Sequence, residues 1–214
     1  PSAIPTVRRM QLKRADTLIL GCFHSDPTTK PSRKKEKERL VETVQKYIQN
    51  DKYPIILCPP QTTAPELTKL FSEAGIPTAV HSSIFKINRV YENYGSKLGR
   101  YTMYSHKYTK NKVILYPMFD NRHNRIRKPL PPGPVFIVED GIYSNYSTGE
   151  ALRFTSEDFS LNSVADGNEL KDIVMAIRPQ NTLLFGPYVK RYAKILEGLC
   201  EVGTLDMNNQ PSLF

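Results

Sequence analysis

With 214 residues, of which 39% are hydrophobic, the chain can bury one large core or two smaller ones, which favours a globular protein over a disordered or fibrous one. No apolar run approaches the roughly 18 residues that a membrane span requires, so we expect a soluble protein without a membrane partner. Cys22, Cys58 and Cys200 lack the spacing of a zinc or redox motif, so we expect free thiols in a reducing, intracellular compartment.

The net charge of +9 is distributed unevenly along the chain. Residues 86–128 hold eleven Lys and Arg against two Asp and Glu, whereas residues 129–214 hold six against eleven. A basic middle beside an acidic end predicts a polarised surface, and polyanions such as nucleic acids commonly bind such surfaces. An ordinary solubilising surface charge is the alternative. For the charged run at 33–39 we expect a solvated helix face.

The first 140 residues alternate between strand and helix patterns. Short apolar runs predict strands at 15–20, 55–58, 77–81, 113–116 and 135–138. Apolar residues at helical spacing predict helices over 33–51, 63–74 and 84–94. We expect the third helix to bury Ile84, Ile87, Val90, Tyr91 and Tyr94. This alternation is typical of an α/β unit with a parallel sheet, a Rossmann-like arrangement.

A polar link at 141–150 precedes a second series of strands and helices. We expect strands at 159–163, 181–185 and 202–206, and helices at 167–177 and 187–199. Between the last two strands of the first series lies a basic loop at 120–128, and the proline-rich segment that follows it is stiff enough to hold this loop away from the core.

Several short stretches follow one another in the order and spacing of a known family. They are 15–20; 55–60 with Thr63 and Glu66; 75–81 with 88–91 and Gly95; 135–138 with Gly141; 162–166 with Leu170; and 184–186. Together they resemble the β-CASP branch of the metallo-β-lactamase superfamily, which contains nucleases of DNA repair and RNA processing. The resemblance implies a β-CASP α/β unit plus the C-terminal half of a metallo-β-lactamase αββα sandwich. It also implies domains at 1–29 and 151–214 (the partial sandwich) and at 30–150 (the β-CASP-like unit).

The departures from this family fall on its metal ligands. The positions that match the family's later ligands are Gly21, Val164 and Phe185, and none of these side chains can bind zinc. The first ligand motif, His-x-His-x-Asp-His, does not occur in the 214 residues. We therefore expect no metal, no cofactor and no catalysis, with Val164 and Phe185 buried as packing residues.

The resemblance and the charge pattern together predict a catalytically inactive nuclease homologue that binds nucleic acid or serves as a non-catalytic subunit of a nucleic-acid-processing complex. The candidate phosphate-binding residues are Arg89, Lys97, Arg100, Lys107, Lys110, Lys112, Arg122, Arg125, Arg127 and Lys128. Three tyrosines lie among them and are candidates for stacking on bases, although strand packing explains them equally well: Tyr101, Tyr104 and Tyr108.

Two other functions stay open. One is a protein-assembly scaffold without nucleic-acid contact, since half a sandwich exposes apolar surface that a partner chain or self-association would cover. The other is an active nuclease whose site a partner completes, or one built on the carboxylate pair Glu139-Asp140 at a strand end. We expect the four histidines (His24, His81, His106 and His123) to be surface or capping residues rather than ligands.

Overall fold

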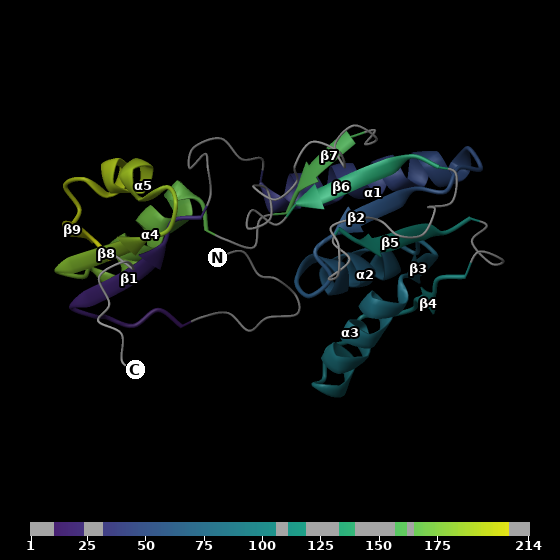
Figure 1. Ribbon diagram of the computed structural model, residues 1–214, viewed down its shortest axis with the longest axis horizontal. Helices are drawn as coiled ribbons and strands as arrows, with labels where there is room; N and C mark the ends of the chain where they lie inside the picture. Colours follow the sequence, from purple (N-terminus) through teal and green to yellow (C-terminus); the bar gives the residue numbers. More distant parts are fainter. Residues whose placement is uncertain are drawn as a thin grey trace, which may run out of the picture. The chain divides into compact units, whose positions relative to one another are not determined.

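The computed structural model describes residues 11–23, 32–105, 111–118, 133–139, 157–161 and 165–205. The chain divides into two compact units, of which unit 1 consists mainly of Arg9–Lys30 and Val164–Phe214, and unit 2 mainly of Pro31–Ser163. Each unit contains one sheet, and all described strand pairs are parallel (Figure 1). The predicted α/β class with parallel sheets is confirmed. None of the described helices is long and apolar enough to span a membrane.

Unit 2 is built on a six-stranded sheet in the order β4-β3-β5-β2-β6-β7. Its strands are β2 (Ile55–Cys58), β3 (Thr78–Val80), β4 (Thr102–Met103), β5 (Val113–Pro117), β6 (Val135–Glu139) and β7 (Glu157–Ser160). In the centre of the sheet, Ile56 lies opposite Leu115 on one side and Phe136 on the other. All residues of β2, β3 and β5 are buried, as expected for inner strands of a parallel sheet. The two-residue strand β4 is too short for its sequence to have predicted it.

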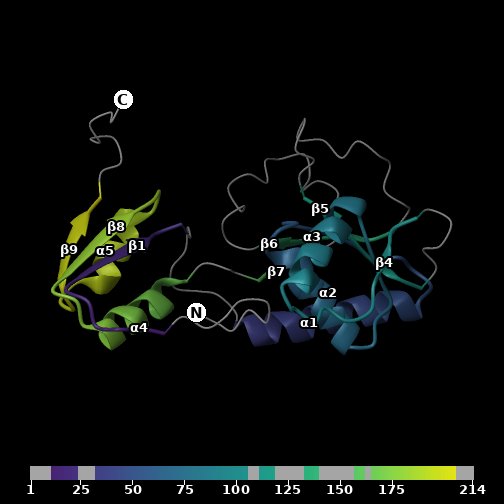
Figure 2. The same cartoon turned by 90° about the horizontal axis from the view of Figure 1, so that it is seen from below.

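The three helices of unit 2 pack against the same face of this sheet. They are α1 (Arg33–Gln49), α2 (Thr63–Glu73) and α3 (Ser82–Asn93), and in Figure 2 α1 and α2 lie below β5 and β6. Their buried side chains share a cluster with alternate strand residues such as Ile56 and Cys58. The residues between these, such as Ile55 and Leu57, form a separate cluster on the other face, as strand alternation requires.

Helix α3 buries a different face from the predicted one. Ile84 is buried, but Val90 is 53% exposed and Tyr94 is 89% exposed, so the prediction was wrong for these two residues. The position one turn after Ile84 is Asn88, which is fully buried and donates a hydrogen bond from Nδ2 to Thr68 Oγ1 at 3.0 Å. Because α2 supplies a hydrogen-bond partner, the polar residue Asn88 can occupy a core-facing position of α3. The pattern of apolar residues alone therefore predicted the wrong face of this helix.

The charged run at the start of α1 is only partly solvated, because Lys34, Lys35 and Glu38 are exposed and its other charged residues are not. Glu66 of α2 is buried and accepts from Arg33 Nη2 at 2.6 Å and from Lys37 Nζ at 2.6 Å. The side chains of Arg33 and Lys37 are only 12% and 21% exposed. The expectation of a solvated face therefore holds for one side of the helix and was wrong for the side of Arg33 and Lys37, because a carboxylate on a neighbouring helix neutralises part of their charge, which the sequence of α1 does not reveal.

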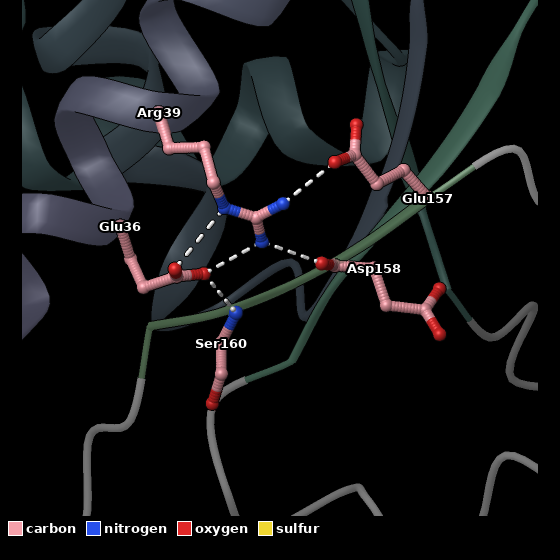
Figure 3. Close-up of polar contacts among 5 residues, drawn as sticks. All are labelled: Glu36, Arg39, Glu157, Asp158 and Ser160. Carbon is pink, nitrogen blue, oxygen red and sulfur yellow. Dashed lines mark hydrogen bonds and ion pairs between the residues drawn. The ribbon is translucent and has the colours of Figure 1, made fainter. Parts of the chain in front are cut away.

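Glu36 and Arg39 connect α1 to β7, in a group that we call the β7 latch: Glu36, Arg39, Glu157, Asp158 and Ser160 (Figure 3). Arg39 donates to both carboxylate oxygens of Glu36 (3.1 and 2.9 Å), to Glu157 Oε1 (2.7 Å) and to the Asp158 carbonyl (2.8 Å). Its guanidinium also lies 4.0 Å from the centre of the Phe159 ring. Buried Glu36 accepts in addition from the Ser160 backbone N–H at 3.2 Å. One carboxylate therefore holds the arginine that binds the edge strand.

Strand β7 pairs with β6, with Ile137 opposite Asp158 and Val138 opposite Phe159. Unit 2 accordingly runs to Ser163, whereas the sequence placed the domain boundary at 150 and a strand at 159–163 in the following domain. A strand pattern does not say which sheet the strand joins. Phe159 determines that β7 joins the sheet of unit 2, since the centre of its ring lies 6.0 Å from that of Phe136 in the unit 2 core.

Unit 1 contains a three-stranded sheet in the order β1-β8-β9. Its elements are β1 (Thr17–Gly21), α4 (Gly167–Ile177), β8 (Asn181–Phe185), α5 (Val189–Leu196) and β9 (Glu201–Thr204). Both helices pack on the face that carries Leu20 and Leu184. Helix α4 begins in a capping box, in which Asp166 Oδ1 accepts from the Glu169 N–H at 2.9 Å. The predicted bounds of α4 and β8 agree with the structure.

We predict that Glu36→Ala lowers the free energy of unfolding by about 1–3 kcal/mol, because it leaves the Ser160 N–H and part of the Arg39 guanidinium without their acceptor. Glu38→Ala on the same helix is the matched control, because Glu38 is 56% exposed and makes one weak ion pair at 3.9 Å. Chemical denaturation of both variants measures the difference. Equal stabilities would show that the β7 latch contributes nothing.

Candidate nucleic-acid interface

A hollow of about 830 Å³ lies in unit 2 at the amino ends of β3, β4 and β5. Its lining comes from three places: the end of α2 with the turn that leads into β3, the face of α3 from Phe85 to Glu92, and the segment 99–102 with Lys112. We call it the amino-end hollow. Parallel α/β proteins usually hold substrates and cofactors at the opposite, carboxyl edge of the sheet, so its position does not suggest a conventional active site.

Three of the predicted phosphate-binding residues meet at this hollow: Arg89, Arg100 and Lys112. Lys112 Nζ donates to Thr102 Oγ1 at 3.2 Å, which places the ammonium group beside the first residue of β4. Among the residues that the structure describes, the Arg100 guanidinium has no hydrogen-bond or ion-pair partner, and its side chain is exposed. Two cations are therefore available to an anion that enters the hollow.

The third cation belongs to a network on the wall formed by α3. Arg89 Nη1 and the Tyr101 hydroxyl both donate to Glu92 Oε2, each at 3.0 Å. Burial, and then the hydrogen bond to Glu92 and its charge, raise the pKa of Tyr101 to about 12, so the phenol remains a donor at neutral pH. The Phe85 ring meets the Tyr101 ring edge to face at 5.6 Å. This wall is aromatic, its one carboxylate is paired with Arg89, and its hydrogen bonds hold it in place.

The other predicted interface residues do not lie in this hollow. Six of the basic candidates fall outside the described residues: Lys107, Lys110, Arg122, Arg125, Arg127 and Lys128. Lys97 is exposed but does not line the hollow. Tyr104 packs with the cluster on the sheet face opposite α1, α2 and α3, where burial raises its pKa, and Tyr108 is outside the described residues.

Sequence reasoning missed Phe85, Glu92 and Ser72 as lining residues. A signal for the first two exists, because Phe85, Arg89 and Glu92 follow the spacing i, i+4, i+7 and so share one face of α3. Ser72 had no comparable signal. Its hydroxyl accepts from the Arg100 backbone N–H at 2.8 Å, a contact between residues 28 positions apart.

The matched metal positions hold no donor atoms in the part of the chain described. Gly21 and Phe185 are partners in the β1–β8 register, so the fold brings these two positions together, while Val164 lies outside the described residues. Phe185 packs edge to face on Phe23 at 5.5 Å but is only partly buried, so the expectation of a buried side chain is not met. These side chains do not fit a zinc ion, and that the chain binds none stays a prediction.

The remaining candidate catalytic residues support no site within the described residues. His81 caps α3, since its Nδ1 accepts from the Ser83 N–H at 3.3 Å, and its ring lies 4.6 Å from that of Tyr116. Glu139 ends β6, and its predicted partner Asp140 is outside the described residues, as are His24, His106 and His123. No three His, Cys, Asp or Glu side chains in the described ranges lie close enough together to hold a metal ion.

Comparison with known proteins identifies the fold but not a family. No protein-family model matches the sequence, and no curated protein matches it significantly. Among solved structures, the chain is similar to the crystal structure of a protein of unknown function from Enterococcus faecalis V583, with a TM-score of 0.55 and 12% sequence identity. The match covers 92% of this chain and 51% of the other, so this chain spans about half the length of that protein. At this identity the likeness concerns the fold alone.

We predict that Gly99→Ala disrupts the amino-end hollow. Gly99 has a φ of +84°, and an added Cβ would collide with Ser72 Oγ, which positions Arg100 and hence the whole segment. Gly95→Ala is the matched control, because Gly95 has a φ of +90° but nothing within 4 Å of an added Cβ. Both variants carry the backbone strain, on the order of 1–2 kcal/mol, and Gly99→Ala adds the collision. Thermal denaturation measures the melting temperatures of both variants, and equal melting temperatures would contradict the predicted collision.

Proposed function

We propose that this chain is a catalytically inactive homologue of β-CASP nucleases that binds nucleic acid through the amino-end hollow, alone or as the non-catalytic subunit of a nucleic-acid-processing complex. The observation that carries the proposal is the convergence of Arg89, Arg100 and Lys112 with Tyr101 on one hollow. These residues come from a helix, a loop and the start of a strand within residues 89–112, and they were candidates on sequence grounds alone.

The chemistry of the hollow suits a phosphate-bearing ligand. The Arg100 guanidinium is planar and offers paired donors, which match two oxygens of a phosphate. Lys112 adds a compact positive charge beside the hydroxyl of Thr102. With three cations and the single carboxylate of Glu92, the lining has a net positive charge that attracts a polyanion.

A non-catalytic role agrees with the positions that the β-CASP resemblance identifies. Gly21 and Phe185 stand where active relatives carry metal ligands, and neither offers an electron-pair donor. Nucleases of that kind need metal ions to activate water and to stabilise charge on the phosphate. In the hollow itself, the one carboxylate already accepts from Arg89 and Tyr101.

A second candidate function, protein assembly, rests on the sheet of unit 1. Its helices cover one face, while the other carries Ile19, Leu183 and Phe185, with Ile19 55% exposed. Parallel sheets normally have both faces covered, so this face is a candidate contact surface for a second chain. Binding and assembly are compatible, because they use different units.

We predict that changing Arg100 and Lys112 together to alanine weakens binding of a labelled oligonucleotide at low salt. Each lost phosphate contact should also lower the slope of log affinity against log salt by about one. The matched control replaces Lys35 and Lys46, two exposed lysines of α1, and changes the net charge equally. If both double variants lose the same affinity, general charge rather than the hollow binds the nucleic acid. If the unaltered chain binds no oligonucleotide, the proposal is wrong.

For the assembly candidate, we predict that the chain self-associates through the sheet face of unit 1. Ile19→Asp should make it monomeric, because burial of an unpaired carboxylate against an apolar partner is energetically unfavourable. Met175→Asp is the control, since Met175 is also apolar and 46% exposed but lies on helix α4. Sedimentation velocity measures the oligomeric state, and circular dichroism checks folding. A chain that is already monomeric at high concentration would contradict self-association through this face.

A further inference from the structure

We infer that the amino-end hollow takes a single unpaired nucleotide and that its Glu92 wall favours bases with an exocyclic amino group (adenine, cytosine or guanine) over thymine and uracil. The inference rests on the proposed function and specifies its ligand. It follows from the distribution of charge and aromatic surface around the hollow.

The lining of the amino-end hollow has two chemically different parts. Tyr101 and Thr102 are consecutive residues leading into and starting β4, and consecutive side chains of an extended segment point to opposite sides. Thr102 contacts Lys112, whereas Tyr101 contacts Glu92. One part is thus cationic, and the other is aromatic and carries the Arg89–Glu92 ion pair.

The two parts of the lining suit different parts of a nucleotide. Arg89 already shares an ion pair with Glu92, whereas Lys112 and the Arg100 guanidinium have no carboxylate partner among the described residues, so the phosphate belongs on the cationic part. Its base then faces Phe85, Tyr101 and Glu92. Bases of a duplex are paired and stacked inside it, so only an unpaired base can enter a hollow and reach this wall. A volume of about 830 Å³ is ample for one nucleotide.

Glu92 can accept a further hydrogen bond from a ligand. Its Oε2 accepts from Arg89 and Tyr101, while Oε1 has no partner among the described residues. The Glu92 side chain is 24% exposed and lines the hollow, so Oε1 can accept from a ligand. An exocyclic amino group supplies that donor. Thymine and uracil instead present two carbonyl oxygens that flank one N–H, and these oxygens are repelled by a carboxylate.

The test measures the affinity of the full chain for short fluorescent homopolymers of deoxyadenosine, deoxycytidine and deoxythymidine, and for a duplex of equal length. We expect the single strands to bind more tightly than the duplex, and the deoxythymidine homopolymer to bind roughly 5- to 10-fold more weakly than the deoxycytidine homopolymer, which corresponds to about one hydrogen bond of ordinary strength, because Glu92 is partly exposed to water. Glu92→Gln should bring this ratio close to one, because a neutral amide offers both a donor and an acceptor. Glu73→Gln, an exposed carboxylate on α2, should leave the ratio unchanged.

The outcomes separate the base preference from nucleic-acid binding itself. If the unaltered chain binds the deoxythymidine homopolymer as tightly as the deoxycytidine homopolymer, the base preference is wrong and nucleic-acid binding still stands. A preference that persists in a folded Glu92→Gln variant would overturn the assignment to Glu92. Tighter binding of the duplex would overturn the unpaired nucleotide. Absence of binding to every homopolymer would remove the proposed function and this inference together.

Discussion

Every described strand pair in this protein is parallel, and two parallel strands can be joined only by a segment that crosses back over the sheet. In unit 2, α2 and α3 are such crossings, and both pack on the same face. Each crossing must return to the amino edge before the next strand begins. The ends of α2 and α3 therefore meet at this edge, and the amino-end hollow forms where they turn. Its residues are adjacent because of the topology, although they span positions 72 to 112 of the sequence.

Buried carboxylates complete the packing of unit 2. Glu36 and Glu66 lie on neighbouring helices, and each is buried with arginine or lysine partners. A buried carboxylate is tolerated only when charge and hydrogen bonds compensate it. The Glu66 pairs join α1 to α2 and so form only when both helices are in their final positions, whereas the Glu36–Arg39 pair lies within α1. Glu36 has the wider reach, because through Arg39 and Ser160 it also attaches the edge strand β7 to the sheet. Acidic residues that seem suited to the surface thereby contribute to the interior.

The two surfaces that carry the proposals belong to different units and differ in chemistry. The amino-end hollow of unit 2 is cationic with an aromatic wall, as expected for a ligand that combines phosphates and flat rings. The sheet face of unit 1 that α4 and α5 leave uncovered is apolar where Ile19 and Leu183 lie side by side, as expected for a contact with protein. Variants in one unit can therefore test one surface without altering the other. The likeness to a solved structure of about twice this length is compatible with either role, since it concerns the fold alone.

Local patterns in the sequence were sufficient to predict the class of fold and most of its elements. Helix α4 and strand β8 have the predicted bounds because their signals are local: a capping box at Asp166 and apolar residues at helix and strand spacing. The sequence also singled out Arg89, Arg100 and Lys112, since excess charge is visible in composition. Only the tertiary structure decided that these three share one hollow, that Asn88 rather than Val90 faces the core, and that β7 joins unit 2. Each of those outcomes depends on a partner distant in the chain, such as Ser72 for Arg100, Thr68 for Asn88 and Arg39 for β7, and no local pattern encodes which distant partner a residue will meet.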